Sequence, residues 1–391
     1  MPAVIQSTQV MPHLNKQAKF LRKNVSSPAF IPGLDLSEGY FFDEIQPLIT
    51  MYLPELPYSA ALIGGSSEVL GFDTEMSTDH DWGPRVMIFL HEEDFVKKET
   101  AMRNVAMKHL PQKYKNYQIR FFAQGVKSPA TRHRLNPGDP GLEPMIDIYT
   151  LRSFLDKHMG IDIDRPMSVS DWLSTTHHRL RALVSGRVYR DDIGLQAVRD
   201  RFAWYPHNIW LYILASCWNR IGEAEVLTGR AGSVDDNLGS KIIAMRLVRD
   251  IMRLGFLMER VYPPYSKWFG SAFRELKCAP TLLPLLCEVA QAADWKKRDK
   301  LLAKTYRILV TMHNALRLTV AVPDTPKRFW ERPFTIIGGG SIAVSLANEI
   351  KDSSVKSLAN RWLIGNVDLF NDNHVLDDDP SQRHLLKTLY E

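Results

Sequence analysis

The sequence has few cysteines and no long apolar run. Its 391 residues include three cysteines, Cys217, Cys278 and Cys287, and none belongs to a Cys-x-x-Cys pair. This pattern excludes a disulfide scaffold and a cysteine-rich zinc site. It is typical of a reducing compartment, so we expect a cytoplasmic protein. The longest apolar stretches, such as residues 210–218, span about nine residues, whereas a membrane helix needs roughly 18, so we expect no membrane span.

An excess of charge of one sign is also missing. Lysine and arginine number 49 against 44 aspartates and glutamates, which gives a net charge of +5 and a pI near 8.9. So small an excess permits binding of an anion such as a nucleotide. No basic run alternates with aromatic residues, which argues against RNA as a partner. The Walker motif of P-loop proteins and the Gly-x-Ser-x-Gly motif of hydrolases are both absent.

The composition is that of an ordinary folded protein with more than one domain. Apolar residues make up 45% and charged residues 24% of the chain. We expect an α+β fold, in which a small mixed sheet with helices is followed by a mainly α-helical domain. The predicted organisation is a mobile basic tail (1–30), an α/β domain (31–160), a helical domain (161–325) and a C-terminal segment packed on the helical domain (326–391). The oligomeric state stays open.

Hydrophobic periodicity predicts alternating helices and strands in the first 150 residues and mainly helices after residue 166. The predicted strands cover residues 58–63, from near 79 to 90, 117–122 and 145–151. The predicted helices cover residues 34–53, 92–110, 168–183, 193–203, 206–221, 236–261, 281–293, 296–317, 341–351 and 354–364. Residues 128–144 are predicted to form a loop and residues 185–192 a turn.

A glycine-serine turn is the first feature with chemical meaning. Gly65, Ser66 and Ser67 follow the predicted strand 58–63. Glycine lets a phosphate approach the backbone closely, and the turn can offer backbone N–H groups and hydroxyls to it. We therefore expect these three residues to bind a nucleotide phosphate.

Three aspartates are the second feature. Asp79 and Asp81 would share one face of a strand, and two adjacent carboxylates favour a cation such as Mg²⁺ between them. Asp147 is a lone charge between β-branched residues on a predicted strand, so it needs a partner. That partner is either a metal ion shared with the other two acids or a neighbouring arginine. The alternatives for the first pair are a solvated turn and a bend of the strand at Pro84.

Basic residues in the second half are candidates for ligand contact. Arg246, Arg249 and Arg253 lie at i, i+3 and i+7 of the predicted helix 236–261 and so follow one face. Such a stripe is either a solvated surface or a clamp for a triphosphate.

The ordered set of turn, Asp-x-Asp strand and later single aspartate resembles the polymerase-β-type nucleotidyltransferase superfamily. The layout of a small α/β domain before a helical domain resembles the aminoglycoside nucleotidyltransferases. The sequence is more similar to an uncharacterised nucleotidyltransferase-like family known by a domain-of-unknown-function label. The motifs of that resemblance are Gly65–Asp73, Asp79–Arg85, Gly186–Asp192, Tyr265–Phe269, Pro333–Gly338 and Ile364–Asp368.

The resemblance implies Mg²⁺-dependent transfer of a nucleoside monophosphate from a nucleoside triphosphate, with ATP as the expected donor, to a small-molecule acceptor. Asp79, Asp81 and Asp147 are then the catalytic and metal-binding residues, and Asp147 either binds a second metal ion or acts as general base. Two alternatives stay open: a nucleotide-binding or regulatory protein without catalysis, and a transferase acting on RNA or protein. The expected nucleotide-binding residues are Gly65, Ser66, Ser67, Lys241 and Arg246, and the expected substrate-binding residues are Arg187, Arg190 and Lys267.

Overall fold

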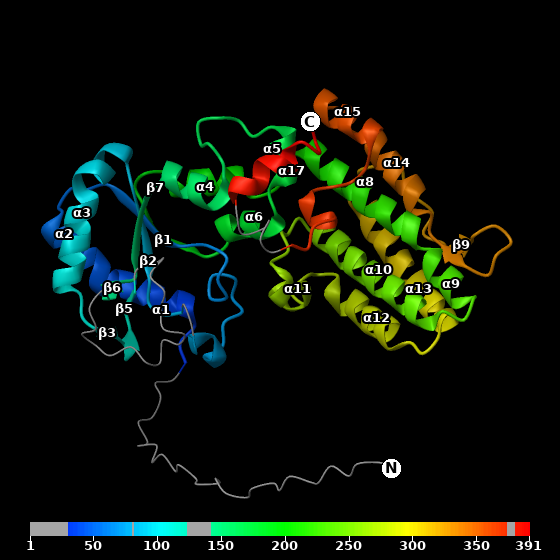
Figure 1. The fold of residues 1–391 in the computed structure, drawn as a ribbon, viewed down its shortest axis with the longest axis horizontal. Coiled ribbons are helices and arrows are strands. Elements are labelled where there is room, and N and C mark those ends of the chain that lie inside the picture. The colour runs from blue at the N-terminus through cyan, green and yellow to red at the C-terminus, as the bar shows by residue number, and fades with distance from the viewer. Residues whose placement is uncertain (1–29, 80–81, 123–141, 374–379) are drawn as a thin grey trace, which may run out of the picture.

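A computed structural model describes residues 30–79, 82–122, 142–373 and 380–391. It has an α+β fold, as expected: a sheet covered by helices lies at one end and a group of longer helices at the other (Figure 1). The predicted basic tail lies almost wholly outside the described residues. In the described part of the chain, no helix is both long and apolar enough to cross a membrane.

The elements follow in chain order. The strands are β1 (Tyr58–Leu62), β2 (Val86–Leu90), β3 (Lys113–Tyr114), β4 (Tyr117–Gln118), β5 (Arg120–Phe122), β6 (Leu142–Pro144), β7 (Ile146–Thr150), β8 (Arg187–Asp191), β9 (Lys327–Arg328) and β10 (Thr335–Ile336). The helices are α1 (Gly33–Tyr40), α2 (Gln46–Tyr52), α3 (Glu92–His109), α4 (Leu151–Met159), α5 (Val169–Ser174), α6 (His177–Val184), α7 (Leu195–Arg201), α8 (His207–Ala224), α9 (Leu227–Gly232), α10 (Asn237–Met258), α11 (Ser266–Phe273), α12 (Ala279–Gln291), α13 (Trp295–Ala315), α14 (Gly339–Asn348), α15 (Ser353–Arg361) and α17 (Arg383–Lys387).

The main sheet is mixed and has the order β7-β2-β1-β8. Strand β1 is antiparallel to both of its neighbours, whereas β2 and β7 run parallel, with α3 in the connection between them. One end of the sheet therefore gathers the end of β1 and the beginnings of β2, β7 and β8. In that register Met87 lies opposite Asp147.

The predicted strand from residue 79 to 90 is wrong in its first part. Residues Glu75–Asp79 form a 3₁₀ turn, and β2 begins only at Val86. Gly83 has a φ of +152°, and Pro84 has no N–H to donate to a neighbouring strand, so the pairing cannot extend backwards. Asp79 therefore does not lie on this strand, and Asp81 lies outside the described residues.

The predicted turn at residues 185–192 is also wrong. Residues 187–191 form strand β8, which pairs with β1 and completes the sheet. Gly186 makes this possible: its φ is +81°, and a Cβ on it would lie 2.0 Å from the carbonyl oxygen of Leu62. The strand comes from the segment assigned to the helical domain. The domain boundary at residue 160 stays a prediction, and any boundary has to allow for this strand.

Two further segments are divided more finely than expected. Residues 117–122 form two short strands, β4 and β5, which pair with different partners. Residues 168–183 form two helices, α5 and α6, and the side chain of Thr176 accepts a hydrogen bond from the N–H of Arg179 to cap the second helix. A side-chain cap ends one helix and starts another without interrupting the apolar periodicity.

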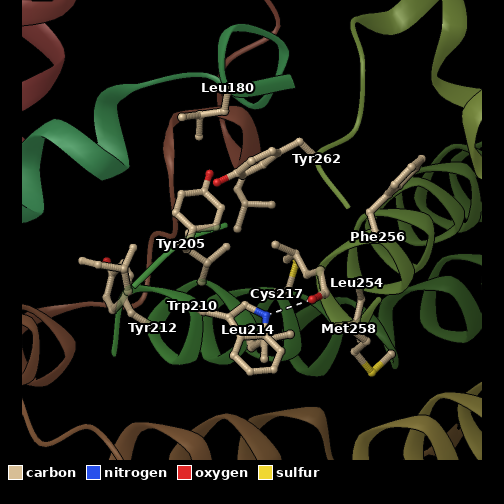
Figure 2. Packing of buried hydrophobic residues seen from close by; sticks show 14 of the residues in the cluster. Leu180, Tyr205, Trp210, Tyr212, Leu214, Cys217, Leu254, Phe256, Met258 and Tyr262 are labelled. Atoms are coloured by element: carbon tan, nitrogen blue, oxygen red, sulfur yellow. Dashed lines mark hydrogen bonds between the residues drawn. The ribbon is translucent and has the colours of Figure 1, made fainter. Parts of the chain in front are cut away.

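The helical part is organised around α8. Helix α8 carries twelve buried residues, and its Trp210 donates a hydrogen bond of 2.8 Å to the carbonyl oxygen of Leu257 in α10 (Figure 2). Helix α14 packs tightly on α8, because a Cβ on Gly222 would lie 2.4 Å from the backbone nitrogen of Gly340. The three glycines at 338–340 thus begin a helix that approaches α8 closely.

Candidate functional site

A cavity of about 290 Å³ lies at the end of the sheet where β1 terminates. We name it the turn pocket. Its walls come from the turn after β1, from β2 and β7, and from α4 and α6. Its polar lining consists of Gly64, Gly65, Ser66, Arg85, Asp147, Tyr149, His158, His178 and Arg179.

Asp147 enters this pocket from the middle of β7. Its side chain is half-buried, and it makes no hydrogen bond or ion pair with any residue that the structure describes. Burial, with the charge of Asp147 added to it, raises the pKa of Tyr149 two residues away. The arginine partner considered for Asp147 is thus not found among the described residues, and the carboxylate faces the pocket.

Arg85 braces the glycine-serine turn. Its Nη2 donates to the Ser66 hydroxyl at 2.6 Å and lies 2.6 Å from a carboxylate oxygen of Glu68, a side chain that is 1% exposed. The guanidinium therefore lines the pocket while neutralising a buried acid. Ser67 lies in the same turn with its hydroxyl 3.5 Å from Glu68, and it does not line the turn pocket.

A different acid, Asp73, holds the loop that carries the Asp-x-Asp pattern in place through hydrogen bonds. The carboxylate of Asp73 accepts hydrogen bonds from the backbone N–H of Gly33 at 2.7 Å and from the indole of Trp82 at 2.9 Å. Asp79 ends the 3₁₀ turn inside this loop. Its side chain and the whole of Asp81 lie outside what the structure describes, so their metal-binding role stays a prediction.

Two histidines close the turn pocket from its helical side. His178 lies over Gly65, where a Cβ would come within 2.5 Å of its ring, so a larger residue at this position would require the ring to move. His158 has a buried Nε2 without a hydrogen-bond partner among the described residues. Burial, aided by Lys157 and Arg179, lowers the pKa of His158 to about 4, so this imidazole is neutral near pH 7.

A second cavity, of about 820 Å³, adjoins the first. Gly65 and His178 line both cavities, so the two share a wall. We name the second cavity the arginine pocket. Its other lining residues include His177, Arg249, Arg253, Tyr265, Phe269, Asp368 and Asp372.

The charges around the arginine pocket form a network centred on a buried acid. Asp250 is 0% exposed and lies 3.2 Å from Arg220, 3.6 Å from Arg253 and 4.0 Å from Arg246. Arg249 donates from one nitrogen to both carboxylate oxygens of Asp372, at 2.9 and 2.7 Å. Four arginines thus surround two acids on this side of the pocket.

The structure brings Gly65, Ser66 and Asp147 together and leaves the other described candidates elsewhere. Of the arginine stripe considered as a triphosphate clamp, Arg249 and Arg253 line the arginine pocket, whereas the five basic residues expected to bind nucleotide or substrate line neither pocket. Arg187 and Arg190 belong to β8 and form ion pairs, Lys241 is exposed on α10, Arg246 reaches Asp250, and the Lys267 ammonium lies 4.8 Å from the centre of the Trp268 ring. Their predicted contacts with ligands stay predictions.

The predicted metal site is only partly described. No group of three histidine, cysteine, aspartate or glutamate side chains suited to a metal ion occurs within residues 30–79, 82–122, 142–373 and 380–391. Asp147 nevertheless fits a Mg²⁺ site, since its carboxylate is an oxygen donor open to a pocket and without a cationic partner in the described structure.

Sequence reasoning missed His158, His178 and Arg179, and it chose Arg246 where Arg253 lines the pocket. The two histidines stand in helices with no partner at metal-ligand spacing, so no local signal marks them. Arg246 and Arg253 are seven residues apart and share one helix face, so periodicity cannot separate them.

Comparison with known proteins gives one match. Residues 172–269 match the family model of a domain of unknown function, DUF4037. No curated protein and no solved structure matches the chain. The matched segment runs from α5 to α11 and supplies much of the wall of the arginine pocket, including His177, Arg249, Arg253 and Phe269.

Proposed function

We propose that the protein transfers a nucleoside monophosphate from a nucleoside triphosphate to a small-molecule acceptor in a metal-dependent reaction. One observation carries the proposal. The Gly65–Ser66 turn and Asp147 are separated by about 80 residues and meet in one pocket, together with Arg85 and Arg179. A glycine turn and two guanidinium groups suit phosphate oxygens, and an unpaired carboxylate suits a metal ion or a proton.

The triphosphate is best placed at the turn. Arg85 and Ser66, whose hydroxyl accepts a hydrogen bond from Arg85, line the pocket, and Arg179 on α6 lines it too. The N–H of Gly64 is already donated to the carbonyl oxygen of Ala182 at 2.9 Å, which fixes the turn against α6. Binding therefore meets a turn that is already organised, which lowers the entropic cost of association.

Bound Mg²⁺ would supply charge neutralisation on the phosphate oxygens, and Asp147, with Asp79 and Asp81 as further expected ligands, would hold it. In the transfer, the acceptor's hydroxyl oxygen forms a bond to the α-phosphorus. The bond between the α-phosphorus and the α–β bridging oxygen breaks, and pyrophosphate leaves with that electron pair. The hydroxyl proton is released to solvent when Asp147 binds the metal ion; in the alternative role of Asp147 as general base, its carboxylate accepts that proton.

The two adjoining cavities give room for two substrates. The turn pocket, at about 290 Å³, is at the lower limit of the roughly 300–1,000 Å³ of small-molecule sites. The arginine pocket adds about 820 Å³ across the shared residues Gly65 and His178. A donor at the turn and an acceptor in the neighbouring cavity would meet at this wall.

The test is a pyrophosphate-release assay with each of the four ribonucleoside triphosphates and Mg²⁺, with and without a protein-free metabolite extract. We expect release that needs the extract and is lost in Asp147→Asn. The matched control is Asp164→Asn, because Asp164 is exposed and pairs with Arg152 away from both pockets. Metal-dependent nucleotide binding in calorimetry without release would favour the binding-protein alternative. If neither pyrophosphate release nor nucleotide binding is observed, the proposal is rejected.

A further inference from the structure

The arginine pocket contains a buried cation that the protein does not satisfy. Arg253 is 8% exposed, and its Nη1 has no hydrogen-bond partner in the described part of the chain. This Nη1 lies 3.6 Å from a carboxylate oxygen of Asp250, and the Nη2 lies 3.8 Å from one of Asp372; both are ion pairs, but the distances are beyond those of hydrogen bonds. A buried N–H of a charged group is costly when no acceptor meets it, so an anionic acceptor that enters the pocket would gain a hydrogen bond here.

The acids near Arg253 are engaged with other groups. Asp250 also faces Arg220 and Arg246. Asp368 accepts hydrogen bonds from the backbone N–H of His177 at 2.8 Å and from the amide of Asn366 at 2.6 Å. None of these acids accepts a hydrogen bond from the Arg253 Nη1, which leaves that N–H group open to an acceptor on a ligand.

Arg249 adds a second cation that a ligand can reach. It lies one turn before Arg253 on α10, lines the same pocket and is 40% exposed. Its partner Asp372 is 67% exposed, and an exposed ion pair contributes little to stability. An entering anion could thus replace Asp372 at Arg249 with little loss of stability.

Another part of the pocket wall is largely apolar. Pro263, Pro264, Tyr265 and Phe269 line it. An acceptor made only of charged groups would leave this surface without contacts. An apolar or aromatic body would bury it, at a gain of roughly 25 cal/mol for each Å² removed from water.

We propose that the arginine pocket binds the acceptor, and that the acceptor is a small hydroxylated molecule with an anionic group, a carboxylate or a phosphate, on an apolar body. This inference rests on the proposed function. The anionic group contacts Arg253 and Arg249, the apolar body lies against Tyr265 and Phe269, and the hydroxyl points to the wall shared with the turn pocket. There its oxygen takes the nucleotidyl group, with release of pyrophosphate and a proton.

The first experiment divides a protein-free metabolite extract on an anion-exchange resin and assays each fraction with the full-length protein, ATP and Mg²⁺. We expect pyrophosphate release with the retained fraction. Prior treatment of that fraction with phosphatase, removed before the assay, distinguishes the two anions: loss of activity indicates a phosphate, and retention a carboxylate. Release only with the unretained fraction overturns the inference.

Two variants locate the site. Arg253→Gln should raise the apparent KM for the retained fraction at least tenfold and leave the KM for ATP unchanged. The matched control is Arg246→Gln, because Arg246 lies on the same face of α10 and contacts the same Asp250 but does not line the pocket. A rise in the KM for ATP alone, or equal effects of the two variants, overturns the inference. If Arg253→Gln does not fold, the half-exposed Arg249→Gln takes its place with the same expectation.

A binding measurement separates this inference from the proposed function. If no fraction supports pyrophosphate release, the transferase proposal fails. Shifts in the thermal unfolding temperature then show whether the arginine pocket still binds an anion. The probes are 4-hydroxyphenylacetate and phenyl phosphate, with the neutral 4-hydroxyphenylacetamide as comparison. Stabilisation by an anion that is lost in Arg253→Gln supports an anion site without transfer. No stabilisation by either anion, or equal stabilisation by the amide, overturns it.

Discussion

The turn pocket and the arginine pocket share a wall but differ in which charged group lacks a hydrogen-bond partner in the described structure. In the turn pocket the cation Arg85 is paired with a buried acid, and the acid Asp147 has no partner in the described structure. In the arginine pocket the acids are engaged, and the buried cation Arg253 has a free N–H. An unpaired carboxylate suits a metal ion or a proton, and a guanidinium N–H without an acceptor suits an anion. This difference supports the proposal that the two cavities bind different ligands.

The largest expected effect separates the two pockets by activity. Asp147→Asn should lower pyrophosphate release by roughly a hundred- to ten-thousandfold, the range for loss of a positioned acid or base. Arg253→Gln should leave kcat within about threefold at saturating acceptor, because an interaction made equally in ground and transition states affects KM. Steady-state kinetics on both variants checks this difference. Equal losses of kcat would mean that one site carries both functions.

The next largest effect distinguishes the two pockets by the loss of folding stability when an arginine is replaced. Arg85→Met should cost about 3 kcal/mol in the free energy of unfolding, because it leaves the buried Glu68 without its cation. Arg249→Met should cost less than about 1 kcal/mol, because its ion pair with Asp372 is exposed. Urea denaturation measures both. The double variant Glu68→Gln/Arg85→Met should recover much of the loss; failure to do so would show that Arg85 stabilises the turn by packing.

A third effect is the pH dependence of folding stability that His158, in the turn pocket, contributes. The pKa of His158 is lowered to about 4 in the folded protein, against about 6.5 in the unfolded chain. The stability linked to this neutral histidine is complete above pH 6.5 and is lost as the pH falls toward 4, on the order of 2 kcal/mol. His158→Gln should lack this component in denaturation curves between pH 7 and 4. The exposed His207→Gln should retain it, and a profile unchanged by His158→Gln would contradict the prediction.

The smallest effects belong to residues outside both pockets. Arg187→Gln and Lys241→Gln should change nucleotide binding by less than about twofold and stability by about 0.5 kcal/mol or less, as for most surface substitutions. Arg187 is held by Asp35 and Glu38, and Lys241 is exposed. Calorimetry with ATP and Mg²⁺ checks the binding. A tenfold loss in either variant would place the donor outside the turn pocket.

Prediction from the sequence succeeded where a signal is local. The strand 58–62 and its glycine-serine turn follow from an apolar run that ends in two glycines, and the long helices follow from their periodicity. Asp147 does lie on a strand, as its place between two β-branched residues predicted, and it lines the turn pocket; its catalytic role stays a prediction. Prediction from the sequence failed at residues 79–85, where Gly83 and Pro84 stop the strand pairing. It also failed at residues 187–191, where the partner strand lies about 130 residues away.

The sequence by itself determined the α+β class, the turn after β1 and the placement of Asp147 on a strand, because each depends on neighbouring residues. Only the tertiary structure decided that β8 joins the sheet, that His158 and His178 face the turn pocket, and that Arg253 rather than Arg246 lines the neighbouring cavity. Residues seven apart on a helix point the same way. Which of them is covered depends on the elements packed against each turn, here α11 and the segment around Asp368, and those contacts join parts of the chain that no local pattern connects.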